Sequence, residues 1–218
     1  MWKYYFFDFN FTIADTTDDI VAAVNATFKN MGLKACSEND IINTIGLSLK
    51  DAYITLQADF SDEHIACFCK EIQTRTIQVG QKAYIYQGVK ELFQWLHFHN
   101  YKIGIVTSND IKVVKKLLEM NESYPYVDVV IDGNSVPFTK PNPAPILHAM
   151  NLVGADHSES VFIGDCLIDA RAAKKANIDF VAVLTGWESK KRFLDFGISN
   201  TRIFDDIREF YKELSHID

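Results

Sequence analysis

An aspartate and an asparagine, Asp8 and Asn10, directly follow an aromatic run near the start of the chain. The run, residues 4–7, is apolar enough for a buried strand, and a strand that ends at an aspartate carries its carboxylate to a sheet edge, where open α/β folds place their chemistry. A carboxylate there can act as a nucleophile. The amide of Asn10 cannot donate and recover a proton as a carboxylic acid does. The segment therefore indicates covalent chemistry at Asp8 beside a residue that cannot assist it by proton transfer.

Polar residues also follow other predicted strands. A hydroxyl-rich turn, residues 107–110, leads into a helix and offers hydroxyls and helix N-terminal amides to an anion. Lys140 lies in a proline-flanked segment that starts another helix. Asp165 and Asp169 follow a buried strand, and their spacing of four places both carboxylates on one side of a first helical turn. Three carboxylates, a lysine and a hydroxyl turn are thus expected at one sheet edge.

The elements that would position these residues alternate between strand and helix. Such alternation predicts a parallel sheet with right-handed crossovers. The first strand belongs to this sheet because it is too apolar to lie alone on a surface. We predict an α/β fold, a doubly wound parallel-sheet (Rossmann-like) core. Its predicted strands span residues 4–7, 102–107, 127–131, 161–163 and 180–184, and its helices span 89–99, 111–120, 143–150 and 167–176, with two more helices closing the chain.

A different pattern fills the stretch between the first strand and the rest of the sheet. Residues 16–84 show helical spacing with no convincing strand, and several polar residues are suited to cap helices. We therefore expect an inserted all-helical cap over the sheet edge where Asp8 emerges, with a hinge near residues 84–88. The predicted domains are 1–15 and 86–218 for the core and 16–85 for the cap. The expected caps are Thr16 or Thr17, Ser37 with Asp40, Ser48 and Ser61.

Composition excludes several classes of function. The 218 residues carry a net charge of −7 without a basic stripe, so a nucleic acid polymer is not an expected partner. No run approaches the roughly 20 apolar residues of a membrane span, and the N-terminal run is too short for a signal peptide. The four cysteines are too irregularly spaced for a disulfide framework or a zinc site. We expect a cytoplasmic protein without a membrane partner, and either a monomer or a homodimer.

Taken in order, these motifs resemble the haloacid-dehalogenase-like (HAD) hydrolase superfamily, and most closely its phosphoglycolate-phosphatase-like branch. The resemblance covers nearly the whole chain, and a helical cap inserted after the first motif is typical of that branch. Four ordered motifs make a specific signal, whereas any one of them alone would be weak. The motifs that carry it are Asp8-x-Asn10-x-Thr12, Thr107, Lys140 and Gly164-Asp165-x-x-x-Asp169.

The resemblance implies a role for each motif. Asp8 would attack phosphorus and form an aspartyl-phosphate, and Lys140 would neutralise the negative charge that gathers there. Mg²⁺ would be the cofactor, held by Asp8, the backbone carbonyl of Asn10 and Asp165. Asp169 would orient Lys140 or water on the metal. The remaining predicted site residues are Thr107, Ser108 and Asn109, which with Lys140 would bind the phosphoryl oxygens, and Thr12 in support.

Two residues depart from the family pattern. The family's phosphatases carry aspartate where this chain has Asn10, so only the carbonyl role of Asn10 survives, and hydrolysis of alkyl phosphates should be slow. Asn10 is open to three interpretations: a natural loss of the proton donor, a deliberate substitution, or an amide suited to chemistry that needs no such acid. Phe11 stands where the family commonly has glycine, and its ring either crowds the turn or packs under the cap.

The predicted function is a Mg²⁺-dependent phosphatase acting on a small phosphorylated metabolite, a phosphoglycolate-like phosphomonoester. One alternative is a phosphate-binding or regulatory relative that keeps the pocket and has lost turnover. Another is a 2-haloacid dehalogenase, which also uses an aspartate nucleophile. It is disfavoured because it does not need the metal pair, Asp165 and Asp169.

Overall fold

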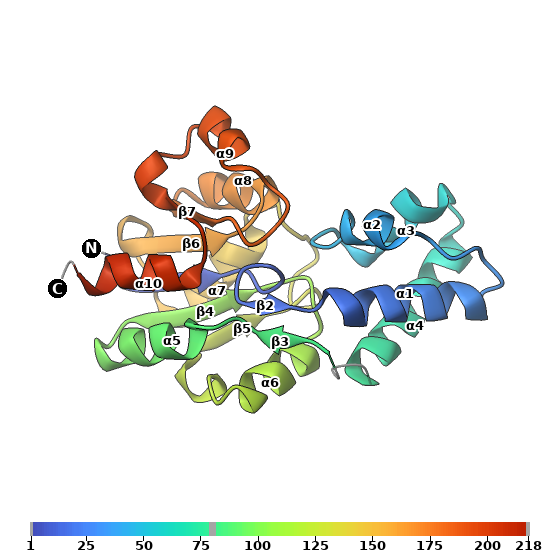
Figure 1. Cartoon of the computed structure of the whole chain (residues 1–218), viewed down its shortest axis with the longest axis horizontal. Coiled ribbons are helices and arrows are strands. Elements are labelled where there is room, and N and C mark those ends of the chain that lie inside the picture. Colours follow the sequence, from blue (N-terminus) through green and yellow to red (C-terminus); the bar gives the residue numbers. More distant parts are fainter. Residues whose placement is uncertain (1, 79–81, 217–218) are drawn as a thin grey trace. The chain divides into compact units, whose positions relative to one another are not determined.

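A computed structural model describes residues 2–78 and 82–216 of the chain (Figure 1). The chain divides into two compact units. Residues 1–14 and 85–218 form the first, which we call the core unit, and residues 15–84 form the second, the helical unit. The core unit holds every residue predicted to take part in chemistry.

A six-stranded parallel sheet runs through the core unit in the order β5-β4-β1-β6-β7-β8. β1 lies between β4 and β6, so its backbone is hydrogen-bonded on both sides, as its aromatic sequence predicts. The predicted α/β, Rossmann-like fold class is confirmed. The strands are β1 (Tyr4–Phe7), β4 (Lys102–Val106), β5 (Val129–Ile131), β6 (Ser160–Gly164), β7 (Asp179–Val183) and β8 (Ile203–Phe204).

Helices connect the strands and pack on the sheet (Figure 1). α7 packs against β4 and β5 and next to α8, which packs against β6 and β7, whereas α5 packs against β4 and next to α10. Parallel strands require such crossovers. The helices of the core unit are α5 (Val89–Phe98), α6 (Ile111–Met120), α7 (Ala144–Val153), α8 (Leu167–Ala176), α9 (Lys190–Phe196) and α10 (Ile207–Ser215), with short 3₁₀ turns η1 (Tyr124–Tyr126), η2 (His157–Glu159) and η3 (Asn200–Arg202).

Within its described residues the helical unit has four helices, and three of the predicted caps form as expected. The hydroxyls of Ser37, Ser48 and Ser61 accept hydrogen bonds from the backbone N–H groups of Asp40, Asp51 and His64. Thr16 is the N-cap residue of the first helix, but its side chain makes no capping hydrogen bond. A core of buried side chains that includes Phe28, Tyr53 and Phe68 holds these helices together. The helices are α1 (Thr17–Asn30), α2 (Glu38–Ile42), α3 (Leu49–Gln57) and α4 (Asp62–Gln78).

Three short strands were not predicted. β2 (Ala14–Asp15) and β3 (Tyr84–Ile85) pair where the chain passes between the two units, at the place where a flexible hinge was expected. β8 adds a sixth strand beside β7. Each of the three has two residues, which is too short for an alternating pattern to be detected in a sequence.

No helix in the described part of the chain is long and apolar enough to cross a membrane.

Close packing at the centre of the sheet can be tested at Gly104 in β4. A Cβ atom at this position would lie 2.5 Å from the ring of Phe6 and 3.1 Å from Val129. We expect Gly104→Ala to lower the free energy of unfolding by about 1–3 kcal/mol, because buried side chains must shift to admit the methyl group. Urea unfolding followed by tryptophan fluorescence measures this, since all three tryptophans lie in the core unit. Lys116→Ala on the exposed face of α6 serves as the control, and an equal effect of both changes would contradict the packing.

Candidate active site

An ion-pair network joins three of the predicted site residues. The ammonium of Lys140 lies 2.5 Å from Oδ1 of Asp8 and 2.8 Å from Oδ1 of Asp169. It also lies 5.2 Å from the centre of the Phe162 ring, in β6. All four side chains are buried or nearly so. Residues far apart in the chain therefore meet at the carboxyl end of the sheet, as predicted.

Asp8 is the first residue after β1, and its backbone N–H donates to the carbonyl of Ile163 in β6, at 2.9 Å. Burial raises the pKa of Asp8 to about 6, despite the opposing attraction of Lys140. Burial alone would lower the pKa of Lys140, but the Asp169 and Asp8 carboxylates outweigh it and hold that pKa above its usual range. Lys140 is therefore a permanent cation that cannot deliver a proton near neutral pH.

The predicted pair of carboxylates, Asp165 and Asp169, spans the start of α8. Asp165 precedes the helix, which has Cys166 as its N-cap residue, so Asp165 and Asp169 do not share a helical turn as the spacing predicted. The hydroxyl of Thr12 donates to Oδ1 of Asp165 at 3.4 Å. Gly186, after β7, packs so tightly that a Cβ atom there would lie 1.9 Å from Oδ2 of Asp165. Three chain segments thus fix the position of the Asp165 carboxylate.

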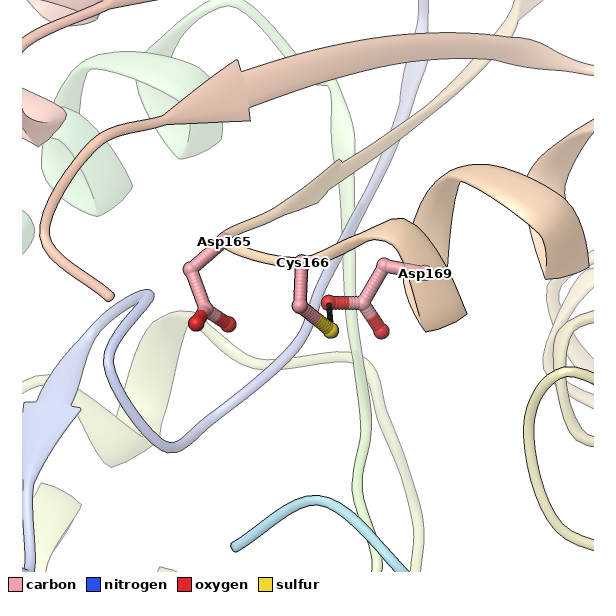
Figure 2. A group of neighbouring side chains, drawn as sticks. All are labelled: Asp165, Cys166 and Asp169. Atoms are coloured by element: carbon pink, nitrogen blue, oxygen red, sulfur yellow. Dashed lines mark hydrogen bonds between the residues drawn. The ribbon is translucent and has the colours of Figure 1, made fainter. Parts of the chain in front are cut away.

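Cys166 is a site residue that sequence reasoning did not identify. Figure 2 shows its thiol beside the Asp169 carboxylate, and Sγ donates to Oδ2 of Asp169 at 3.1 Å. Burial, with the charge of Asp169, raises the pKa of this thiol well above its usual value, so it stays a protonated donor. The donor atoms of Asp165, Cys166 and Asp169 lie within 4.8 Å of one another. In the sequence, the position of Cys166 between Asp165 and Asp169 was the one sign that it belongs to the site.

The charges of this site fit a divalent cation. Three buried carboxylates and one ammonium leave a formal charge of minus two. Lys140 forms ion pairs with Asp8 and Asp169, and no ion pair to Asp165 is found among the described residues. Burial and the neighbouring Asp169 and Asp8 charges raise the pKa of Asp165 well above its usual value, so a cation bound beside it would favour its ionised form. Carboxylate oxygens are the ligands that Mg²⁺ prefers.

Asn10 forms a reciprocal amide pair with Asn109, which follows β4. Asn109 Nδ2 donates to Oδ1 of Asn10 at 2.7 Å, and Asn10 Nδ2 donates to Oδ1 of Asn109 at 3.4 Å. Asn10 is buried. The pair holds the Asn10 side chain in one orientation and joins the loops that follow two neighbouring strands.

The predicted phosphate-binding residues lie in the loop that follows β4. Thr107 is buried, and its hydroxyl oxygen accepts the Asn109 backbone N–H at 3.1 Å. A phosphoryl group that used this N–H would have to displace that bond. Gly133, after β5, packs against the Ser108 carbonyl, where a Cβ atom would approach to 2.8 Å. The side chain of Ser108 makes no hydrogen bond to another predicted site residue in the described structure.

Phe11 adopts a backbone conformation that is rare for its residue type. Its φ is +58°, in the left-handed region that favours glycine. Its ring packs edge-on against Trp187, with ring centroids 6.0 Å apart, and its carbonyl accepts a hydrogen bond from the Thr185 hydroxyl. The left-handed turn therefore forms with phenylalanine, and the ring finds a packing partner within the core unit.

Comparison with known proteins places this site in a family. The family model for haloacid dehalogenase-like hydrolases matches residues 5–183. A phosphoglycolate phosphatase from Psychrobacter arcticus is 27% identical, over 92% of this chain and 90% of its own. A pyrophosphatase, PpaX, from Halalkalibacterium halodurans is 28% identical, over 81% of each chain. The chain thus belongs to the haloacid dehalogenase-like hydrolase family and is similar to its phosphoglycolate phosphatases.

Solved structures support the same fold. A haloacid dehalogenase-like hydrolase structure from Bacteroides fragilis superposes with a TM-score of 0.89, over 96% of this chain and 100% of that chain, at 23% identity.

The buried carboxylate of Asp8 predicts a pH-dependent stability of the metal-free protein. A carboxyl whose pKa is raised on folding holds its proton more tightly when folded, so its ionisation destabilises the fold as pH rises from about 4 to about 6. The free energy of unfolding of Asp8→Asn, relative to wild type, should therefore increase by roughly 1–2 kcal/mol between about pH 5 and about pH 7.5. Urea unfolding of both proteins at several pH values, in the presence of a chelator, measures this difference in the free energy of unfolding. A difference that is constant over this range would contradict the burial argument.

The strained turn at Phe11 predicts an order of stability. Phe11→Ala loses the buried ring and keeps the left-handed conformation, whereas Phe11→Gly loses the same ring and relieves the strain. The glycine variant should therefore be less stable than wild type but about 1 kcal/mol more stable than the alanine variant. Denaturant unfolding of the three proteins decides this, and an alanine variant as stable as the glycine variant would contradict the assignment of strain.

Proposed function

We propose that this protein is a phosphatase that transfers a phosphoryl group to Asp8 and then hydrolyses the aspartyl-phosphate. One observation supports this above all: the buried Lys140 ammonium holds Oδ1 of Asp8 at 2.5 Å. A carboxylate that a cation holds in one position is suited to nucleophilic attack. The cation that anchors it also stabilises the charge of the transition state.

The proposed metal ligands are Asp8, the backbone carbonyl of Asn10 and Asp165, with Mg²⁺ as the cation. When bound, Mg²⁺ supplies positive charge that offsets the repulsion between the nucleophile and the phosphoryl oxygens. The burial of Asp165 beside Asp8 and Asp169, and the hard oxygen atoms that these residues offer, support this assignment. Thr12 and Gly186 hold the Asp165 carboxylate in place. Asp169, with the Cys166 thiol as its donor, orients Lys140.

The proposed phosphoryl-binding group comprises Lys140, the Thr107 hydroxyl and the loop residues Ser108 and Asn109. The substrate is a small phosphorylated metabolite, since the curated relatives named above are phosphatases of small molecules. On a phosphoglycolate-like ester, turnover is slow because Asn10 cannot protonate the leaving alkoxide. We place the enzyme in the cytoplasm, which suits its four free cysteines.

A second candidate is a phosphate-binding protein with the same pocket and no turnover. The buried Asn10 amide favours it, because that residue cannot activate water. The two candidates make the same prediction for phosphate binding and opposite predictions for turnover.

The nucleophile assignment is tested by Asp8→Asn with an aryl phosphate substrate and Mg²⁺. We expect kcat to fall at least about 10³-fold, because the covalent step is lost. Removal of the metal from wild type with a chelator should abolish turnover, and added Mg²⁺ should restore it. Asp195→Asn, at an exposed ion pair with Lys191 in α9, is the matched control and should leave the rate unchanged. Activity that survives in Asp8→Asn would refute the assignment, and no turnover by wild type would favour the binding protein.

A further inference from the structure

We infer that this site is built for phosphoric anhydrides, substrates whose leaving group departs without a proton, in preference to alkyl phosphomonoesters. The inference rests on the proposed function and names the class of substrate. It follows from the residue that stands at position 10, from how that residue is held, and from how the other acidic groups at this sheet edge are used.

Asn10 cannot act as a general acid. It lies two residues after the proposed nucleophile, buried, in the loop that Asp8 begins. Its amide can donate and accept hydrogen bonds but carries no proton that it can give up near neutral pH. An alkoxide is a strong base and needs that proton as it leaves, whereas a phosphate leaving group is a weak base and does not.

A second amide holds the Asn10 side chain in place. Asn109 donates to its oxygen at 2.7 Å and accepts from its nitrogen at 3.4 Å. This pairing matches an amide with an amide, donor to acceptor on both sides. The loop after β4 is thus complementary to asparagine at position 10, and the asparagine is part of the organised site.

The acidic groups Asp110, Asp132 and Glu188, in the loops that follow β4, β5 and β7, are engaged elsewhere. The Asp110 carboxylate caps α6, and that of Asp132 accepts from the Asn134 N–H and the Ser135 hydroxyl. Glu188 pairs with Arg192. The core unit's histidines, as far as the structure describes them, lie on α5, α7 and η2 or at the ends of α5 and α10. None of these lies in a loop that follows a strand, so none replaces the missing proton donor.

With an anhydride, the reaction balances without a donor. An Asp8 oxygen forms a bond to phosphorus, the bridging P–O bond breaks, and its electron pair leaves on inorganic phosphate, so no proton is required. Water then attacks the phosphorus of the aspartyl-phosphate, and the Asp8–phosphorus bond breaks to restore the carboxylate. Both hydrogens of that water remain with the phosphate product. The second step lacks a general base, so the aspartyl-phosphate accumulates.

The experiment compares kcat/KM for inorganic pyrophosphate and phosphoglycolate, with Mg²⁺, in wild type and Asn10→Asp. Wild type should prefer pyrophosphate at least about 100-fold, and Asn10→Asp should raise kcat/KM for phosphoglycolate at least about 100-fold, the low end of what a general acid contributes. For pyrophosphate the gain should stay below about tenfold. Asn151→Asp, exposed on α7, adds the same charge away from the site and should leave the substrate ratio unchanged.

Equal kcat/KM of wild type for the two substrates would overturn the inference, as would an equal gain for both in Asn10→Asp. A second measurement needs no variant: kcat/KM of wild type for aryl phosphates should fall steeply as the leaving group becomes more basic, and a flat dependence would overturn the inference. If neither wild type nor Asn10→Asp shows turnover that Asp8→Asn abolishes, the proposed function itself fails, and the inference fails with it. A preference for phosphoglycolate with Asp8-dependent turnover would overturn the inference alone.

Discussion

The contact on which the site depends is the buried ammonium of Lys140 between the carboxylates of Asp8 and Asp169. Burying a carboxylate without compensation is expensive, and one lysine cannot neutralise three of them. The chain nevertheless concentrates these groups at the carboxyl ends of β1 and β6. The negative charge that remains attracts a divalent cation. That cation and Lys140 together then attract the phosphoryl group, which is itself negatively charged.

The fold supplies the means to hold this arrangement. β1 is bonded to β4 and β6, so the loops that carry Asp8, Thr107 and Asp165 emerge side by side. Close backbone approaches then fix the carboxylates: Gly186 leaves no space for a side chain next to Asp165, and Gly164 none next to Asp169. These glycines, with the thiol of Cys166, limit the movement of charged groups that repel one another. A site held so firmly is suited to electrostatic stabilisation of a transition state.

Much of this arrangement could be predicted from the sequence because parallel strands end at one edge. The aromatic run before Asp8 predicted β1 at residues 4–7, and the predicted helices at 111–120 and 167–176 have the bounds observed. Contacts that depend on side-chain direction could not be predicted. The Asn10–Asn109 pair joins residues 99 positions apart, and the Cys166 thiol could have pointed elsewhere. Phenylalanine ordinarily prefers a negative φ, so the left-handed turn at Phe11 could not be predicted from local propensity.

The central claim is that Asp8 becomes phosphorylated during turnover. The most direct test is mass spectrometry of wild-type protein incubated with Mg²⁺ and pyrophosphate and quenched in acid during the steady state. The account predicts a phosphoryl group on the peptide that contains Asp8, at a higher occupancy in wild type than in Asn10→Asp, because the asparagine leaves water unassisted in the second step. A protein that turns over pyrophosphate with no phosphoryl group on Asp8, or with one on a different residue, would contradict the account.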